Sequence, residues 1–342
     1  MTRSRAIRLL DVAHHAGVSL STASRALSGS DGVRPSLAEL VHESARELGY
    51  VANVHARSLA GGASASVGLV VHEIGDPYFT EIASGVLGVA TGEGLTVQIC
   101  HAGRDPENEL LQIRTLVVSR VRAVVVAGSG YTDPRAESAT RRELAAFQAQ
   151  GGRVAVIGRH GFQADAVLPD NVGGGRSVAE HVLSLGHRRL AVVAGARSLT
   201  TVADRLRGVE SVLTQAGLDL ADVPVLEVPF TREGGQAAAR RILAEHPATT
   251  AILALNDVMA MGVLSVLRQL GVTVPGRVSV TGFDDVAVAQ DLSPSLTTVS
   301  LPMRDMGRTA VELTLRPAAA RPRRKAVEHT LVVRGSTGPV PG

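Results

Sequence analysis

The sequence has almost no lysine, because Lys325 is the only one among its 342 residues. A P-loop, a protein-kinase core and a Schiff-base pocket each need a lysine. A lone lysine among the arginines of residues 321–325 suits none of them, so we expect none of these enzyme classes. The net charge of +3 is too small to indicate a nucleic-acid partner by itself.

Cysteine and long apolar runs are also scarce. The single cysteine, Cys100, cannot form an intramolecular disulfide, so the fold does not depend on an oxidising compartment. Arg8 and Asp11 interrupt the apolar residues that follow the basic N-terminus, and no stretch approaches the ~18 apolar residues of a membrane span. We therefore expect a cytoplasmic protein with no signal peptide and no membrane partner.

Motifs for catalysis and metal binding are absent from the sequence as well. It contains no Gly-x-Ser-x-Gly elbow, no His-x-x-x-His pair and no paired-cysteine spacing. The segment 128–130 is too short a glycine motif to indicate a dinucleotide site. The prediction is a protein that is not an enzyme and that uses no cofactor or metal.

What is present divides the chain into two kinds of pattern. Residues 1–60 hold short helical patterns, whereas from Val67 onward short apolar runs alternate with amphipathic stretches. Such alternation is typical of buried parallel strands joined by crossover helices. We expect strands at 67–71, 96–100, 123–127, 154–157, 190–194, 251–255 and 278–281, and helices at 80–90, 107–119, 141–150, 177–185, 202–216, 234–244 and 258–270.

The predicted fold class is therefore α/β, with an all-α helix-turn-helix unit at residues 1–52 and a two-lobed, parallel-sheet body at 67–342. Residues 53–66 would form a hinge helix and a linker. A break near residues 158–167 separates the lobes in this scheme. The first lobe would take residues 67–160 and 292–320, and the second residues 161–291 and 321–342.

Residues 11–28 fit a helix-turn-helix motif. Gly17 stands where the chain must turn with a positive φ, and Ser19 is a good N-cap for the second helix. On that helix Ala23, Ala26 and Leu27 would be buried, while Leu20, Ser21, Ser24 and Arg25 would point outward. A third helix is predicted to begin at Ser36, where Ser36 and Glu39 form a capping box, and to end at Gly49.

The outward face of the second helix could lie in a DNA major groove. Arg25 would then contact a guanine edge or a phosphate, while Leu20 and Ser21 touch bases. The same pattern also fits a small helical domain used for dimerisation, in which Arg25 is solvated, because helix-turn-helix patterns have many false positives.

Residues 53–59 form a short amphipathic segment capped by Asn53. A helix of this length is marginal in water, so we expect two copies to pair and order only on DNA. Leu59 would then wedge between base pairs in the minor groove, with Arg57 at a phosphate. The alternative is an inert connector.

Motifs along nearly the whole chain are similar to those of lactose-repressor-type (LacI family) transcriptional regulators. They begin with the helix-turn-helix and hinge motifs, and they continue with Asp170-Asn171, Gly186-His187, Asp204-Arg205, Asn256-Asp257 and the run 279–285. The resemblance implies a homodimer or tetramer that binds palindromic operator DNA. It also implies a periplasmic-binding-protein-like body that takes a small-molecule effector in its cleft.

Two departures from the family pattern concern the hinge and the oligomeric state. Ala52 stands where the family usually has proline, which removes a φ restraint before the hinge. No heptad tail follows Gly335, so we do not expect a tetramer built on a C-terminal helix bundle. The residues that we expect at the DNA are Leu10, Ser19, Leu20, Ser21, Thr22, Ser24, Arg25, Ser28, Arg34, Asn53, Ala56, Arg57 and Leu59.

The effector site should lie beyond the carboxyl ends of the strands, where open α/β sheets bind ligands. The chain has only eight aromatic residues, and several of them fall near these ends. The predicted lining is Asp76, Tyr78, Phe79, Ser129, Tyr131, Arg159, Asp170, Arg205, Phe230, Asn256 and Asp284. Three acids against two arginines do not form an anion-capturing set, so a neutral polyol, most simply a sugar, is favoured.

Other readings stay open at this point. The aromatic rings could sandwich a purine or nucleoside. Asn256 could serve only as a helix N-cap, Asp284 only as a turn residue, and Arg205 only as the partner of Asp204. A solute-binding protein without DNA function would share the body, although it would need a signal peptide and no helical unit.

Overall fold

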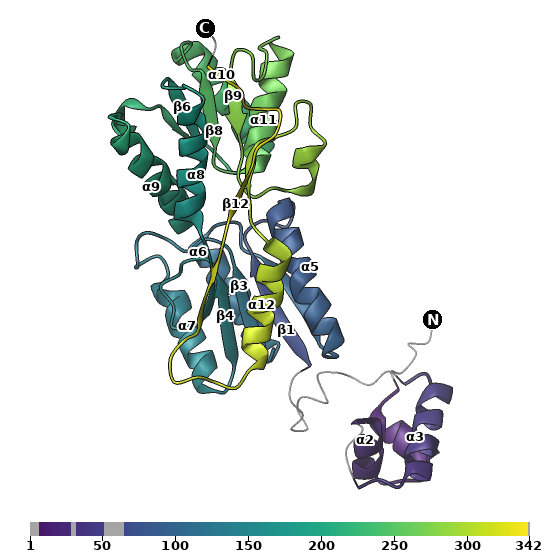
Figure 1. Cartoon of the computed structure of the whole chain (residues 1–342). Helices are drawn as coiled ribbons and strands as arrows, with labels where there is room; N and C mark the ends of the chain where they lie inside the picture. Colours follow the sequence, from purple (N-terminus) through teal and green to yellow (C-terminus); the bar gives the residue numbers. More distant parts are fainter. Residues whose placement is uncertain (1–6, 29–31, 51–64, 341–342) are drawn as a thin grey trace. The chain divides into compact units, whose positions relative to one another are not determined.

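The computed structural model describes residues 7–28, 32–50 and 65–340. The chain divides into two compact units, Met1–Ser64 and Ala65–Gly342 (Figure 1). The predicted fold class is confirmed, because a helical N-terminal unit precedes a body built on two parallel sheets. No helix in the described ranges is long and apolar enough to cross a membrane.

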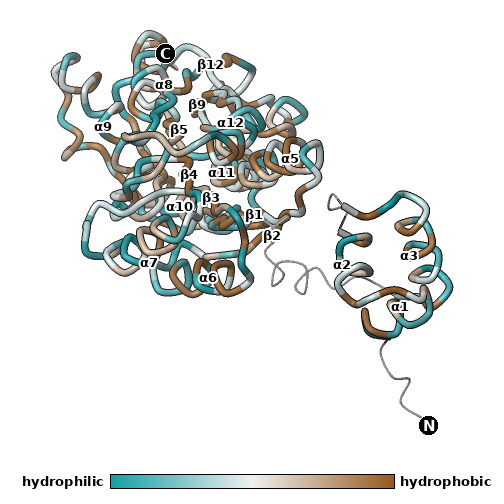
Figure 2. The backbone as a smooth tube through the Cα atoms, turned by 90° about the horizontal axis from the view of Figure 1, so that it is seen from below, coloured by the Kyte–Doolittle hydropathy of each residue, from teal (hydrophilic) through white to brown (hydrophobic). Residues whose placement is uncertain are grey.

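The N-terminal unit consists of α1 (Leu9–His15), α2 (Leu20–Ser28) and α3 (Pro35–Glu47). Its three helices alternate between hydrophobic and hydrophilic residues, as the tube in Figure 2 shows, and they pack around Val12, Ala23 and Val41. The turn before α2 is as predicted, since Gly17 has a φ of +64°. The hydroxyl of Ser19 accepts the Thr22 N–H at 3.1 Å and so caps α2.

The predicted start of the third helix is wrong by one residue. Pro35 occupies the first turn and Arg34 is the N-cap, so Ser36 and Glu39 do not form the expected capping box. Proline favours this position because its ring presets φ and its missing N–H would have had no helical partner.

The first lobe of the body contains a six-stranded parallel sheet in the order β11-β5-β4-β3-β1-β2. Its strands are β1 (Ser66–Val71), β2 (Thr96–His101), β3 (Ala123–Ala127), β4 (Arg153–Ile157), β5 (Asp165–Pro169) and β11 (Arg324–Val327). Its helices are α5 (Pro77–Gly92), α6 (Pro106–Val118), α7 (Ser138–Ala149) and α12 (Met303–Leu315). α5 and α12 lie side by side (Figure 1). They approach so closely at Gly85 that a Cβ there would collide with the Arg304 carbonyl, so this position requires glycine.

The second lobe contains a four-stranded parallel sheet in the order β7-β6-β8-β9. Its strands are β6 (Leu190–Ala194), β7 (Val225–Glu227), β8 (Ala251–Ala254) and β9 (Ser279–Thr281). Its helices pair as α8 (Asn171–Ser184) with α9 (Thr200–Gln215) and as α10 (Arg232–Glu245) with α11 (Asp257–Gln269). Short 3₁₀ turns lie at Leu220–Asp222 and Ala287–Gln290.

The predicted lobe boundaries need correction. Residues 165–169 and 324–327, which the prediction gave to the second lobe, form β5 and β11 of the first sheet, where they pair in parallel. Asp165 is buried beneath this edge, where it pairs with Arg323 at 3.0 Å and Arg153 at 3.5 Å. These charged ends hide both strands from a search for apolar runs, because β11 is the edge strand, which tolerates polar residues, and β5 lies next to it.

Three segments of chain connect the lobes, between β5 and α8, between β10 (Thr298–Ser300) and α12, and between β11 and β12 (Thr330–Val332). β10 and β12 pair antiparallel, and the Asp170 N–H donates to the Val327 carbonyl at 3.0 Å. Figure 1 shows β12 in yellow where the chain passes from one lobe to the other. A change in the angle between the lobes has to be absorbed in these three connections.

Candidate functional site

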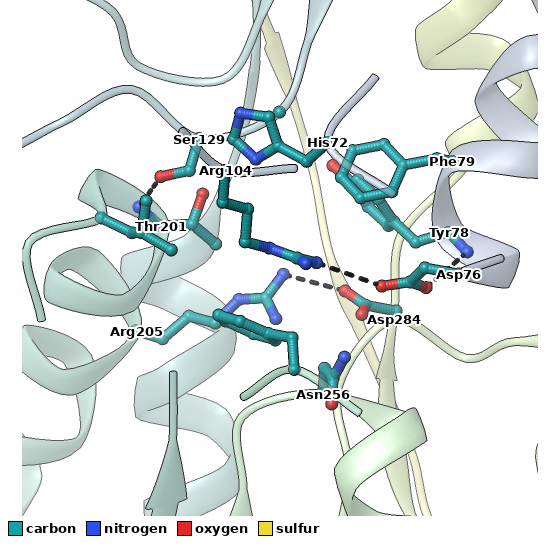
Figure 3. A pocket seen from close by; sticks show the side chains of 13 residues that line it. His72, Asp76, Tyr78, Phe79, Arg104, Ser129, Thr201, Arg205, Asn256 and Asp284 are labelled. Carbon is teal, nitrogen blue, oxygen red and sulfur yellow. Dashed lines mark hydrogen bonds and ion pairs between the residues drawn. The ribbon is translucent and has the colours of Figure 1, made fainter. Parts of the chain in front are cut away.

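A pocket lies between the carboxyl ends of the two sheets, where the sequence analysis expects it. The first lobe contributes residues that follow β1, β2 and β3, and the second contributes residues from α9 and from the ends of β7, β8 and β9. The lining consists of His72, Asp76, Tyr78, Phe79, Arg104, Gly128, Ser129, Leu199, Thr201, Arg205, Phe230, Asn256 and Asp284 (Figure 3).

Arg205 organises the second-lobe wall of the pocket. Its guanidinium donates to Asn171 Oδ1 at 2.9 Å, to Asp284 Oδ1 at 2.8 Å and to the Leu255 carbonyl. Its planar group also lies 3.6 Å from the centre of the Phe283 ring. The side chain is almost fully buried and each of its three guanidinium nitrogens donates one hydrogen bond, so its position is fixed.

Asp284 is the partner that Arg205 presents to the pocket. Burial raises the pKa of Asp284, and the Arg205 guanidinium opposes that shift. The backbone of Asp284 has a φ of +112°, a conformation that L-residues rarely adopt. Asn256 stands beside it and caps α11 through its side-chain oxygen, which accepts the Met259 N–H at 2.8 Å.

The first-lobe wall starts at the beginning of α5. Asp76 caps that helix by accepting the Tyr78 N–H at 3.0 Å, and burial raises the pKa of its carboxyl. The Tyr78 and Phe79 rings meet edge to face at 5.0 Å. Arg104 reaches Asp76 at 3.6 Å, and Figure 3 shows its side chain extending into the middle of the pocket.

Ser129 connects the two walls. Its hydroxyl donates to the Gly130 carbonyl at 2.8 Å and accepts the Thr201 N–H at 3.0 Å. Because Ser129 follows β3 and Thr201 lies in the first turn of α9, this contact crosses from the first lobe to the second.

Eight of the eleven residues predicted for the pocket line it, and three do not. Tyr131 forms a backbone bridge with Leu199, and its buried hydroxyl has no hydrogen-bond partner in the described structure. Arg159 turns away to form a bidentate pair with Asp204 at 2.8 and 3.0 Å. This pair also removes the possibility that Asp204 is the partner of Arg205.

Asp170 is the third residue that lies outside the pocket. One of its oxygens caps α8 by accepting the Gly173 N–H at 2.8 Å, and the other contacts His329 Nδ1 at 3.0 Å. Asp170 follows a strand of the first sheet directly and begins a helix of the second lobe, so it belongs to an interlobe connection rather than to the cleft.

Five further residues line the pocket that were not predicted from the sequence, namely His72, Arg104, Gly128, Leu199 and Thr201. His72 follows β1 directly and Arg104 stands three residues after β2, so the rule that placed the others applies to both. With Arg104 gained and Asp170 and Arg159 lost, the pocket holds two carboxylates and two guanidinium groups. They form two pairs, Asp76 with Arg104 and Asp284 with Arg205.

The space left between these side chains is small, about 40 Å³. An apolar cavity of roughly 150 Å³ is what holds a benzene molecule, so the lining side chains fill most of the site themselves. A ligand of sugar size requires them to move.

The second candidate surface is the exposed face of α2. Leu20 is 48% exposed, Ser21 and Arg25 are exposed, and Ser24 is partly exposed, while Ala23 and Ala26 are buried against the other helices. The Arg25 Nε also donates to the Ser21 carbonyl at 3.4 Å. These residues therefore form one outward face, as predicted, and it combines small hydroxyls, an apolar tip and a cation.

The other residues predicted to contact DNA fall into two groups. Leu10 on α1 and Arg34 before α3 are exposed, and Ser19 and Thr22 lie at the start of α2. Asn53, Ala56, Arg57 and Leu59 lie outside the described residues, as does the side chain of Ser28. In the described ranges no group of three or more His, Cys, Asp or Glu side chains could hold a metal ion.

The chain matches two protein-family models, one over the N-terminal unit and one over part of the body. Residues 8–53 match the family model "Bacterial regulatory proteins, lacI family", and residues 179–337 match "Periplasmic binding protein-like domain". The HTH-type transcriptional regulator DegA of Bacillus subtilis is 32% identical over 339 residues, which are 97% of this chain and 98% of that protein.

Solved structures are similar over the same length. The complex of the transcriptional regulator CelR with cellobiose superposes with a TM-score of 0.69 at 30% identity, covering 96% of this chain and 99% of that chain. The lac repressor dimer bound to operator and an anti-inducer shares the fold, with a TM-score of 0.82 at 24% identity, over 98% of this chain and 100% of that chain.

Proposed function

This chain belongs to the lacI family of bacterial regulatory proteins and is a DNA-binding regulator with an effector-binding body, and we propose that it is a repressor controlled by a sugar. The observation that carries the proposal is the interlobe pocket with its two carboxylate–guanidinium pairs. A protein that binds DNA and an intracellular metabolite would work in the cytoplasm.

The chemistry of the pocket supports a neutral, hydroxyl-rich ligand. Asp76 and Asp284 can each accept hydroxyl donors, and Asn256 can both donate and accept. Each carboxylate already faces a guanidinium, so no uncompensated charge calls for an ionic ligand. The rings of Tyr78 and Phe230 supply apolar faces for the C–H surface of a sugar ring.

Effector binding would act on DNA through the angle between the lobes. A ligand that contacts both walls favours one lobe arrangement, and it shifts operator affinity by the difference in its affinity for the two states. Such couplings are typically about 1–3 kcal/mol. The three adjacent interlobe connections are the segments in which this change would occur.

The active form in this proposal is a homodimer on a palindromic operator. A two-fold operator requires two helix-turn-helix units, one for each half-site. Apolar side chains are exposed along one edge of the first sheet, at Ile99 on β2, Leu87 on α5, and Leu111 and Val118 on α6. An exposed apolar row beside an edge strand is a surface that a second copy could cover.

The DNA contacts remain those of the sequence analysis. Leu20, Ser21 and Arg25 would read bases or phosphates from α2, and Arg57 and Leu59 would act in the hinge. Replacing Leu59 by alanine should weaken binding to operator DNA more than binding to unrelated DNA. Equal losses on both would remove the wedge role.

Two experiments test the proposed function together. A thermal-shift screen of the whole chain against monosaccharides, disaccharides and nucleosides should identify a sugar that raises Tm, since a ligand bound only by the folded state stabilises it. A gel shift with promoter DNA beside the gene should then respond to that sugar. A nucleoside hit would select the purine alternative, and no shift with or without any metabolite would contradict the regulator proposal.

A further inference from the structure

Arg104 enters the pocket from an unusual backbone position. Gly103 and Arg104 follow β2 with φ values of +68° and +57°, so two consecutive residues adopt the left-handed conformation. For arginine this conformation is unfavourable relative to the common regions. The turn aims the side chain out of the first lobe and into the middle of the cleft (Figure 3).

The guanidinium of Arg104 lies between aromatic rings of the two lobes. Its central carbon is 4.7 Å from the ring centre of Phe230 and 6.0 Å from that of Phe79, both within the range of a cation–π contact. Asp76 completes the site at 3.6 Å. Phe79 and Asp76 belong to the first lobe, whereas Phe230 follows β7 of the second, so Arg104 joins the two walls.

The space that Arg104 occupies is the space that a ligand needs. The pocket retains only about 40 Å³ with this side chain in place. The aromatic face of Phe230 and the carboxylate of Asp76, which suit a stacked, hydroxyl-bearing ring, are both engaged by the guanidinium. We infer that Arg104 is a built-in occupant of the effector pocket, which bridges the lobes without ligand and must leave before the effector enters.

The way Arg104 is held is consistent with such an exchange. Across the described residues it has one ion pair and two ring contacts but no hydrogen bond of 3.5 Å or less. Burial also lowers the pKa of its guanidinium, which shows that the charge is poorly solvated there. Departure to the mouth of the pocket would restore the solvation of the guanidinium.

Displacement of Arg104 limits the chemical class of the effector, and this inference rests on the proposed function. An entering molecule has to offer a donor to Asp76 and a flat or C–H-rich face to Phe230, or the exchange leaves the buried carboxylate with the Tyr78 N–H as its one donor among the described residues. A pyranose meets both requirements. Once displaced to the mouth of the pocket, the Arg104 guanidinium can donate hydrogen bonds to the outer hydroxyls of the same ligand.

Chemical rescue tests the occupant directly and needs neither effector nor DNA. In Arg104→Ala the site between Phe79, Phe230 and Asp76 is empty, so millimolar methylguanidinium should bind there. We expect a Tm rise of about 1–3 °C at several times its Kd. Methylurea, which has a similar shape without the charge, should give no rise. Arg114→Ala, which removes a surface arginine paired with Glu143, is the matched control and should not respond.

The possible results test the role of Arg104 separately from the proposed function. Equal responses of Arg104→Ala, Arg114→Ala and the unmodified protein would overturn the inference, and so would equal responses to methylguanidinium and methylurea. Arg104→Gln provides a second vacated site if the alanine variant folds poorly. After a sugar has been identified, Arg104→Ala should bind it with a several-fold higher association rate. An unchanged rate would contradict displacement while leaving the regulator function intact.

Discussion

Two arginines face the same pocket from opposite lobes, and they are held very differently. Arg205 in the second lobe has hydrogen bonds to three acceptors and stacks on Phe283, and its side chain is 4% exposed. Arg104 in the first lobe has one ion pair at 3.6 Å and two ring contacts, and its side chain is 20% exposed. Each nevertheless faces one aspartate.

The difference indicates that the two walls have different tasks. The second-lobe wall is preorganised, so its polar groups keep their positions whether or not a ligand is present. The first-lobe wall contains a cation whose contacts a ligand can replace. A pocket with one fixed and one exchangeable wall can report ligand entry as a change in the contacts between lobes.

The largest expected effect comes from removing the fixed cation. Arg205→Met leaves the buried Asp284 without its partner and removes the donor to Asn171, so we expect a loss of about 3–5 kcal/mol in the free energy of unfolding. Urea unfolding followed by far-ultraviolet circular dichroism measures it, because the chain has no tryptophan. The double variant with Asp284→Asn should lose less than the sum of the single changes. A loss below about 1 kcal/mol would show that the wall is not held by this arginine.

A second effect concerns the buried carboxyl of Asp257, which follows the pocket residue Asn256 at the start of α11. Burial raises the pKa of Asp257 to about 7, and its oxygens accept the Thr298 hydroxyl at 2.6 Å and the Val286 N–H at 2.8 Å. The folded state therefore binds a proton that the unfolded state releases at about pH 4. The stabilisation from this group is complete below about pH 4 and is lost as pH rises through about 7, at up to ~1.4 kcal/mol per pH unit.

Asp257→Asn tests this dependence because an asparagine resembles the protonated carboxyl. Between about pH 4 and about pH 7, the free energy of unfolding of the unmodified protein should fall relative to that of the variant. Above that range the difference between the two should stay constant. Asp170→Asn, at a half-exposed carboxyl, is the control. Parallel stability curves for the unmodified protein and Asp257→Asn would exclude the titration of Asp257.

The smallest expected effect comes from the exchangeable cation. Arg104→Ala removes one long ion pair and the ring contacts but also a poorly solvated charge, so the unfolding free energy should change by no more than about 1 kcal/mol. The same urea experiment measures it. A loss comparable to that of Arg205→Met would mean that both walls are fixed and would remove the contrast between them.

Most central strands could be predicted from the sequence, because a strand covered on both faces is a continuous apolar run. β3 and β6 were predicted with their observed ends, and each of the other five predicted strands differs from the observed one by one residue at one end. β5 and β11 lie at or next to a sheet edge and carry Asp165, Arg324 and Lys325, so hydrophobicity did not mark them. The lobe boundary was displaced for the same reason.

The pocket residues could be predicted to the extent that strand ends determine them. Asp76, Phe230 and Asn256 lie where the strand-end rule puts them. Sequence position does not show which partner a side chain chooses, and Arg159 turned to Asp204 rather than to the cleft. The direction of Arg104 depends on two consecutive left-handed residues in a loop, which no periodicity encodes.

The order of strands in the first sheet has a consequence for synthesis of the chain. β1 to β5 are made early, but α12, which covers one face of that sheet together with α5, and the edge strand β11 come from residues 303–327. The second sheet is continuous in sequence from β6 to β9. We therefore expect the second lobe to fold first during translation, while β3, β4 and β5 of the first lobe lack their covering helix until the end of the chain is synthesised.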